Sequence, residues 1–253
     1  MLHDLDSVKF GKSAPAPLPK LRLMTDHFSE SLPAPPERCD WSKGRRDWGM
    51  MDNDKIGCCT IAAMGHMFQV WTLNARARIW SPSDATILLE YEAVTGYDPE
   101  KPSSDKGAAC ADVLTYLLAN QFDGWTIAGF GKVDNNDVRH VKQCVAMFGG
   151  AYIGVALPRS IKGQSIWDIA GINMTGDNAP GSLGGHCINI VGYDGDYVHV
   201  ITWGQIQLMT WRFFLTYCDE SFCVLAQTWQ HGGKTPVGLS LESLAANMKE
   251  LAA

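Results

Sequence analysis

The strongest constraint on the fold is a change of residue pattern at the Gly149-Gly150 pair. Before this pair, apolar residues recur at helical spacing in four stretches, at 59–80, 82–96, 109–121 and 134–148. After it, short runs rich in β-branched and aromatic residues alternate with clusters of Gly, Asp and Pro; these runs are AYIGVALP, HCINIVGYD, YVHVITW and FCVLAQTW. The sequence therefore predicts an α+β protein whose helices precede its strands.

Three regions follow from this pattern. Residues 1–45 are rich in proline, which cannot sustain a helix, and we expect an extended arm lying over the globular body, with a partly cleaved leader as the alternative. Residues 46–150 are expected to form a helical lobe. Residues 151–253 are expected to form a β-rich lobe that ends in a helix over SLESLAANMKELAA, where Ser240 begins a capping-box pattern.

Within the β-rich half, local signals predict finer features. The stretch INIVGYDGDYVHVITW predicts a hairpin that turns at Asp194-Gly195-Asp196, because Asp-Gly readily takes positive φ. Residues 159–184 form a long glycine-rich loop, and long loops in compact domains are often functional. Residues 210–220 are expected to form a short helix between strands.

Composition narrows the choice of partners. The formal charge is −6 and the pI is near 5.6, without any basic run, which argues against nucleic acid and against an anionic membrane. No stretch is apolar over the roughly 20 residues that span a bilayer, and the N-terminus lacks the apolar core of a secretion signal. We therefore expect a cytoplasmic protein with a small-molecule or peptide substrate; if the substrate is a small molecule, the resemblance described below implies that it contains an amide. The sequence leaves its oligomeric state open.

The cysteines are expected to be reduced thiols rather than disulfides or metal ligands. The 8 cysteines are scattered and come without a secretion signal. No CxxC pair occurs, and His186 and Cys187 are neighbours in a predicted strand, so that their side chains point to opposite faces. Neither a metal site nor a cofactor is expected.

One cysteine and one histidine stand in positions suited to nucleophilic chemistry. Cys59 opens the first apolar helical stretch, and His186 begins a strand 127 positions later (186 minus 59). A helix N-terminus and a neighbouring imidazolium both lower the pKa of a thiol and so favour the nucleophilic thiolate. Cys58 remains an alternative nucleophile, since helix boundaries are uncertain by a residue or two. His66 lies about two helical turns from Cys59, too far to be its base, and is better interpreted as a core histidine.

The two motifs and their order resemble the papain-like cysteine peptidase superfamily over about residues 45–230. Six residues before Cys59 stands Asn53, where that superfamily has a glutamine that helps to form the oxyanion hole. The superfamily's NSWG segment has a partial counterpart in ITWG, where Trp203 and the glycine align. Ile201 stands in place of the asparagine that orients the histidine, and the neighbouring Thr202 is the candidate to replace it.

The resemblance implies a two-lobe fold: a helical N-terminal lobe and a C-terminal lobe built on an antiparallel β-sheet or barrel, with the active-site cleft between them. It implies that Trp203 shields the histidine. Gly184 and Gly185 are expected to let substrate backbone approach His186 closely. Asp219 and Glu220 are expected to be surface charges, with Glu220 as a reserve candidate for orienting His186.

The expected reaction is acyl transfer from a peptide or amide bond to Cys59, with Asn53 and the Cys59 N–H holding the oxyanion and His186 protonating the leaving group. Hydrolysis of the acyl-enzyme is the default outcome. Two alternatives remain open at this point, namely an amide-forming transferase on the same scaffold and a non-catalytic binding protein that retains the fold.

Overall fold

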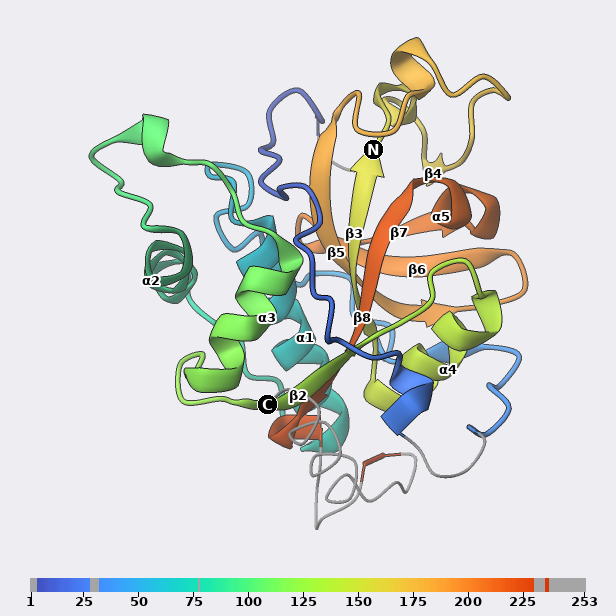
Figure 1. The fold of residues 1–253 in the computed structure, drawn as a ribbon, viewed down its shortest axis with the longest axis horizontal. Coiled ribbons are helices and arrows are strands. Elements are labelled where there is room, and N and C mark those ends of the chain that lie inside the picture. Colours follow the sequence, from blue (N-terminus) through green and yellow to red (C-terminus); the bar gives the residue numbers. More distant parts are fainter. Residues whose placement is uncertain (1–3, 28–31, 77, 230–234, 237–253) are drawn as a thin grey trace.

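The computed structural model describes residues 4–27, 32–76, 78–229 and 235–236, and these contain five α-helices and eight β-strands (Figure 1). The helices are α1 (Cys59–Ala75), α2 (Asp84–Thr95), α3 (Cys110–Ala119), α4 (Val138–Phe148) and α5 (Trp211–Tyr217). The strands are β1 (Cys39–Asp40), β2 (Ile127–Lys132), β3 (Ala151–Leu157), β4 (Ile166–Trp167), β5 (Gly184–Tyr193), β6 (Tyr197–Thr202), β7 (Gln205–Thr210) and β8 (Cys218–Ala226). No helix in this described part is long and apolar enough to cross a membrane.

The strands form one sheet in the order β2-β8-β3-β5-β6-β7-β4, with β1 added to β5. All neighbours are antiparallel except β4 and β7. Helices α1, α2 and α3 gather on one side of the molecule and most of the sheet lies on the other (Figure 1). This is the expected α+β architecture, with the helices mainly in the first half of the chain.

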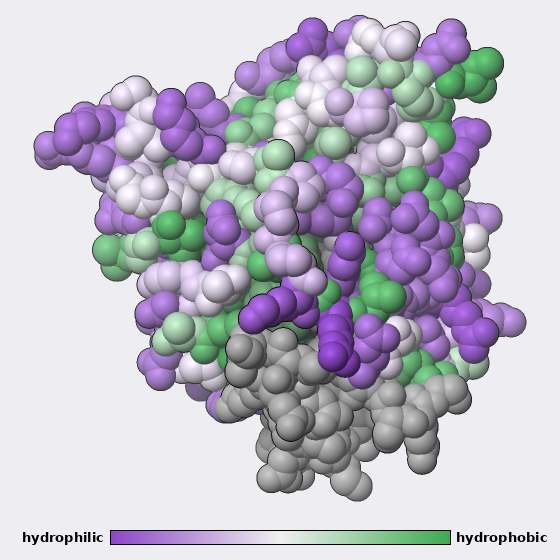
Figure 2. All heavy atoms as spheres, in the orientation of Figure 1, coloured by the Kyte–Doolittle hydropathy of each residue, from purple (hydrophilic) through white to green (hydrophobic). Residues whose placement is uncertain are grey.

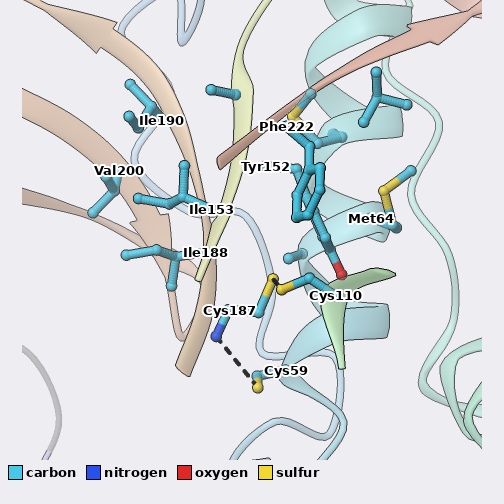
Figure 3. Packing of buried hydrophobic residues seen from close by; sticks show 14 of the residues in the cluster. Cys59, Met64, Cys110, Tyr152, Ile153, Cys187, Ile188, Ile190, Val200 and Phe222 are labelled. Atoms are coloured by element: carbon cyan, nitrogen blue, oxygen red, sulfur yellow. Dashed lines mark hydrogen bonds between the residues drawn. The ribbon is translucent and has the colours of Figure 1, made fainter. Parts of the chain in front are cut away.

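Helix α1 connects the two sides because it is buried along most of its length and packs against β5. Its side chains join one hydrophobic cluster with those of β3, β5 and β8 (Figure 3). Helix–sheet contacts of this kind fix both the depth and the rotation of α1, because close-packed interiors tolerate little displacement. The first residue of α1 is therefore held at a defined place beside the start of β5.

The structure confirms the helix that begins at Cys59 and corrects several other boundaries. Helix α2 begins at Asp84 rather than at Pro82, because the Ser83 side chain caps it by accepting from the Thr86 N–H, and it ends at the left-handed Gly96. Helix α4 begins at Val138 rather than at residue 134, because the Asp137 side chain accepts from two N–H groups of its first turn.

Four strands were not predicted: the two-residue strands β1 and β4, and the six-residue strands β2 and β7. Residues 127–132 form β2, so the first half of the chain is not wholly helical, and residues 205–210 form β7. Strand β2 contains two glycines and β7 two glutamines, so neither sequence strongly favours a strand. Each strand is stabilised by pairing with a neighbour that the local sequence does not reveal.

The predicted hairpin between β5 and β6 is confirmed, but its turn does not use the positive φ that was expected. None of the residues 194–196, all of which are described, has a positive φ. Instead, the Asp194 carboxylate accepts hydrogen bonds from the N–H groups of Asp196 and Tyr197, at 2.9 and 2.7 Å. The predicted loop at 159–184 contains the short strand β4, and the predicted helix at 210–220 is shorter, since β8 begins at Cys218. The predicted C-terminal helix lies outside the described residues.

Two parts of the N-terminal region contact the rest of the protein at different places. In Figure 1 the blue chain of the first described residues descends between α1 and α3 on one side and β3 and β5 on the other. Farther along, β1 pairs with β5 at the opposite end of that strand from His186. Figure 2 shows the same face as a mixture of hydrophilic and hydrophobic residues, with atoms filling the boundary between the two sides.

Candidate active site

Cys59 occupies the first turn of α1, and its neighbour Cys58 is the N-cap residue. The Cys59 sulfur accepts a hydrogen bond from the Cys187 N–H at 3.4 Å, so this thiol lies beside the start of strand β5 (Figure 3). The Cys58 thiol donates instead to the Met51 carbonyl, at 3.4 Å. Only Cys59 therefore reaches the strand that carries His186.

His186 is held on two sides. Its Nε2 atom lies 2.8 Å from the Thr202 hydroxyl, and its ring stacks on Trp203 with centroids 4.3 Å apart and an interplanar angle of 14°. The β5–β6 hairpin explains this arrangement, because it returns the chain so that the end of β6 and the residue after it lie beside the start of β5. The other ring nitrogen, Nδ1, is buried without a hydrogen-bond partner. The imidazole is thus oriented at one nitrogen and available at the other.

Asn53 lies in the turn that leads into α1, and its backbone N–H donates to the Met50 carbonyl. The residue is only 2% exposed, yet its side-chain Nδ2 has no hydrogen-bond partner. A buried amide donor without an acceptor is costly, and most buried polar groups are paired. Asn53 therefore carries a donor that is not used inside the protein.

A segment of the N-terminal arm, residues 8–13, covers this site, and we call it the cover segment. The Gly11 carbonyl accepts from the Ala108 N–H at 2.9 Å, and the Lys12 N–H donates to the Gly185 carbonyl at 3.1 Å. The Phe10 ring lies edge-on to both His186 and Trp203, at centroid distances of 6.0 and 5.9 Å.

Glycines on both sides make this close approach possible. A Cβ atom on Gly11 would lie 1.7 Å from the Gly57 carbonyl oxygen, and one on Gly185 would lie 2.3 Å from the Lys12 carbonyl oxygen. A Cβ on Gly184 would meet the Phe10 side chain at 2.8 Å. Gly184 and Gly185 thus permit close approach of a peptide backbone, and in this structure that backbone is the chain's own.

Burial under the cover segment changes the ionisation of both candidate groups. Cys59 and His186 are each 1% exposed. Burial raises the pKa of Cys59 to about 12, although the backbone N–H groups of Cys187 and Gly11 act to lower it. Burial likewise lowers the pKa of His186 to about 3, with a smaller contribution from His66. The expected lowering of the thiol pKa is therefore wrong for the covered state, in which both groups are neutral.

The remaining thiols and His66 have structural surroundings. All cysteines in the described residues are free, and the sulfurs of Cys110 and Cys187 lie 3.5 Å apart beside Cys59 (Figure 3). His66 is buried within α1, and its Nε2 lies 3.0 Å from the Gly49 carbonyl oxygen. Within the described ranges, no group of three or more His, Cys, Asp or Glu side chains is placed to hold a metal ion.

Two hollows flank Trp203. One, of about 650 Å³, is lined by Arg46, Asp47, Gly49, Met50, Trp203, Gly204, Gln205 and Ile206. The other, of about 410 Å³, lies on the side where residues 4–6 meet the 161–164 turn. Trp203 belongs to both linings, so the tryptophan that stacks on His186 also borders two hollows.

Comparison with solved structures identifies the architecture. Xylellain, a cysteine protease from Xylella fastidiosa, superposes with a TM-score of 0.66 at 14% identity, covering 87% of this chain and 96% of xylellain. Digestive procathepsin L 3 of Tenebrio molitor gives a TM-score of 0.60 at 13% identity, covering 87% of this chain and 77% of the other. The chain has a papain-like fold. The bromelain protease from Ananas comosus also matches, with a TM-score of 0.52 at 12% identity and coverage of 75% and 99%.

Sequence comparison by itself finds no counterpart: no protein-family model matches, and no curated protein matches. The papain-like fold is therefore visible in the tertiary structure, at 12–14% sequence identity to these three proteins.

The sequence did not reveal three participants in this region. Phe10, Gly11 and Lys12 belong to an arm without secondary-structure signals, and only the lone glycine between a large and a charged residue hints at a close approach. Glu220 was expected at the surface but is 7% exposed, and it pairs with Lys12 rather than orienting His186. Asp219 also pairs with Lys12.

Proposed function

We propose that this chain is a cysteine peptidase or amidase that cleaves a peptide or amide bond through an acyl-enzyme on Cys59. The observation that carries the proposal is the state of His186. Its Nε2 is held by Thr202 and its ring by Trp203, while Nδ1 is buried and unpartnered, on a strand whose next residue bonds the Cys59 sulfur. A base oriented from behind and placed beside a helix-terminal thiol is the arrangement that nucleophilic catalysis requires.

In the proposed reaction, the Cys59 thiol gives its proton to His186 Nδ1, and the sulfur attacks the carbonyl carbon of the substrate. The imidazolium then donates this proton to the leaving amine as the C–N bond breaks, which leaves a thioester on Cys59. Water attacks the thioester with His186 again as base, so that the carboxylic acid is released and the thiol is restored.

Thr202 and Asn53 have supporting roles in this proposal. A hydroxyl at Nε2 accepts the ring N–H and so leaves Nδ1 as the proton acceptor, and it also accepts from the imidazolium. The unused Asn53 Nδ2, together with the Cys59 N–H, is proposed to stabilise the oxyanion. Preorganised donors of this kind are typically worth a factor of about 10²–10³ in kcat.

Covering of the sulfur favours one competing hypothesis, a binding protein that keeps the fold without catalysis. Hydrolysis of a fluorogenic peptide library, measured for the wild type, Cys59→Ala and Cys58→Ala, separates the two. We expect Cys59→Ala to lose at least about 10³-fold in kcat/KM, since removal of a nucleophile leaves only binding and oxyanion effects. Cys58→Ala is the matched control and is expected to keep most activity.

Retention of activity in Cys59→Ala, or equal losses in both variants, would contradict the assignment of Cys59. Decay of a Cys59 thioester formed from an activated ester distinguishes hydrolysis from transfer to an amine: a rate independent of added amine supports the hydrolase. Acceleration by amines, with amide product, would instead support an amide-forming transferase.

A further inference from the structure

Lys12 of the cover segment is buried in a pocket with two acidic side chains. Its Nζ lies 2.8 Å from Asp219 Oδ2 and 3.2 Å from Glu220 Oε1, and the lysine side chain is 1% exposed. Burial lowers the pKa of Lys12, but the hydrogen bond to Asp219 and the charge of Glu220 together raise it above the ordinary lysine value. The pocket therefore holds a charged ammonium group.

The pocket exists because strand β8 contains an irregularity. In the pairing with β3, Gly154 lies opposite Glu220 while Val155 lies opposite Cys218, so that Asp219 is the extra residue of a β-bulge. In a regular strand, successive side chains point to opposite faces. A bulge re-aims side chains, and here it allows two consecutive carboxylates to reach the same ammonium group.

Gly154 forms the floor of the pocket, and its lack of a side chain leaves room for the lysine chain. A Cβ atom on Gly154 would lie 2.0 Å from Lys12 Cε and 2.7 Å from both Asp219 Oδ1 and Glu220 Cγ. Any larger residue at position 154 would therefore fill the space that the lysine chain occupies. The site consequently has the depth for a long unbranched side chain and a negative charge at its end.

Departure of Lys12 would leave this charge without a partner. Glu220 is 7% exposed, and burial raises its pKa although Lys12 acts to lower it. An ionised carboxylate buried without a cation is strongly unfavourable, so in an empty pocket Glu220 either takes up a proton or pairs with another cation of similar shape. Lysine and arginine side chains of a substrate have this shape and charge.

Backbone contacts of the cover segment connect the pocket to the neighbourhood of the thiol. The Lys12 N–H donates to the Gly185 carbonyl, next to His186, and the N–H of the preceding residue, Gly11, acts on Cys59. Ala108 also bonds the backbone on either side of Lys12. Its N–H donates to the Gly11 carbonyl, and its carbonyl accepts from the Ser13 N–H. These backbone groups carry no sequence preference, so another extended peptide can use them and present a side chain to the same pocket.

We propose that the pocket formed by Gly154, Asp219 and Glu220 selects a lysine or arginine side chain of the peptide substrate, and that Lys12 occupies it in the covered protein. This inference rests on the proposed function, since it names the substrate class of the same site. It predicts specificity for a basic residue close to the scissile bond. In the substrate this residue should stand next to the residue whose backbone lies at Cys59, as Lys12 stands next to Gly11 in the covered protein.

The test uses the full chain with Gly11→Ala, which is expected to displace the cover segment because the added methyl group meets the Gly57 carbonyl oxygen, and with Cys59→Ala, which is expected to prevent turnover. Fluorescence anisotropy then measures the binding of labelled peptides that differ at one residue, Lys, Arg, norleucine or Glu, scanned along the peptide. At one position we expect Lys and Arg to bind at least about tenfold more tightly than norleucine, and Glu most weakly. Adding Asp219→Asn and Glu220→Gln is expected to remove the preference.

Glu100→Gln is the matched control, because it neutralises an exposed carboxylate away from the pocket, and it is expected to leave the preference unchanged. Equal binding of Lys and norleucine peptides, binding of neither, or a preference that survives the double substitution would overturn the inference. Hydrolysis with Cys59 restored is measured separately. Lys-selective binding without hydrolysis of any peptide would contradict the proposed function and support the pocket.

Discussion

Two segments of the N-terminal arm lie on the same body but are held in different ways. The cover segment, residues 8–13, contacts the site through backbone hydrogen bonds, close glycine contacts and the ion pairs of Lys12 with Asp219 and Glu220. The second, residues 39–43, we call the anchor segment. It adds strand β1 to β5, and its Trp41 packs edge-on to Trp229 with centroids 5.0 Å apart.

The two segments differ in the kind of groups that become exposed when each one is removed from the protein surface. The Trp41 indole N–H donates to the Val145 carbonyl, and the Trp41 carbonyl accepts from Asn74, so its loss exposes apolar surface and unpairs buried groups. Loss of the cover segment instead exposes polar groups that another peptide can pair, among them the Gly185 carbonyl and the Ala108 backbone. We therefore expect a substrate peptide to be able to replace the contacts of the cover segment, but not those of the anchor segment.

The largest effect is expected from Gly11→Ala, which tests whether the cover segment is replaceable. A methyl group there meets the Gly57 carbonyl oxygen, part of a backbone that cannot shift cheaply, so the segment should leave the site. Without this burial the Cys59 pKa should fall from about 12 toward the ordinary thiol range, which raises the thiolate fraction at pH 7 by about 10³-fold. Iodoacetamide labelling with peptide mapping measures the rate.

Gly195→Ala is the matched control for this variant, since a Cβ there meets nothing within 4 Å. Cys144 provides an internal reference because it is buried in the core and its thiol donates to the Gly150 carbonyl. An unchanged Cys59 alkylation rate in Gly11→Ala would show that the cover segment does not control access to the sulfur.

Trp41→Ala tests the anchor segment and is expected to act on stability. Loss of the indole packing and its hydrogen bond should lower the free energy of unfolding by about 2–4 kcal/mol. Urea denaturation measures this change, and the Cys59 alkylation rate at low urea should stay within about twofold of the wild type. A large rise in alkylation in this variant would mean that the two segments leave the body together.

A pH series sharpens the comparison further, because the cover segment buries a titratable group. The His186 pKa is about 3 in the covered protein and about 6.5 in an unfolded chain, so the unfolded state binds the proton first as pH falls. Its contribution to stability is fully present above pH 6.5 and is lost as pH falls toward 3. The slope is at most about 1.4 kcal/mol per pH unit.

In Gly11→Ala we expect His186 to become exposed and this dependence largely to disappear, while that of His66 should remain. Urea unfolding at several pH values between 7 and 5 for both proteins gives the difference in slope. Equal slopes would indicate that burial of His186 does not depend on the cover segment.

The smallest effect is expected from Thr202→Val, which removes the hydroxyl at His186 Nε2. A neutral hydrogen bond of this kind contributes about 1 kcal/mol, so kcat on a peptide substrate should fall by roughly five- to tenfold with little change in KM. Thr202→Ser keeps the hydroxyl and should restore most activity. A change in KM alone, or no difference between Val and Ser, would contradict an orienting role.

Local patterns were sufficient for the elements that carry the site and insufficient for the ones that pair over long distances. The helix at Cys59 and the hairpin after His186 follow from apolar periodicity and turn composition, which are properties of neighbouring residues. Strands β2 and β7 were missed because their sequences are weak strand formers and their stability comes from partners elsewhere in the sheet.

The sequence by itself determined which residues are candidates: a thiol at a helix start, an imidazole at a strand start, and a threonine and tryptophan one strand later. Only the tertiary structure decided their surroundings. It placed Thr202 on Nε2, left Nδ1 unpartnered, and laid residues 8–13 over the sulfur. The physical reason is that the pKa of a buried group depends on everything packed around it, including Lys12, Asp219 and Glu220, which are remote from one another in sequence but share one pocket.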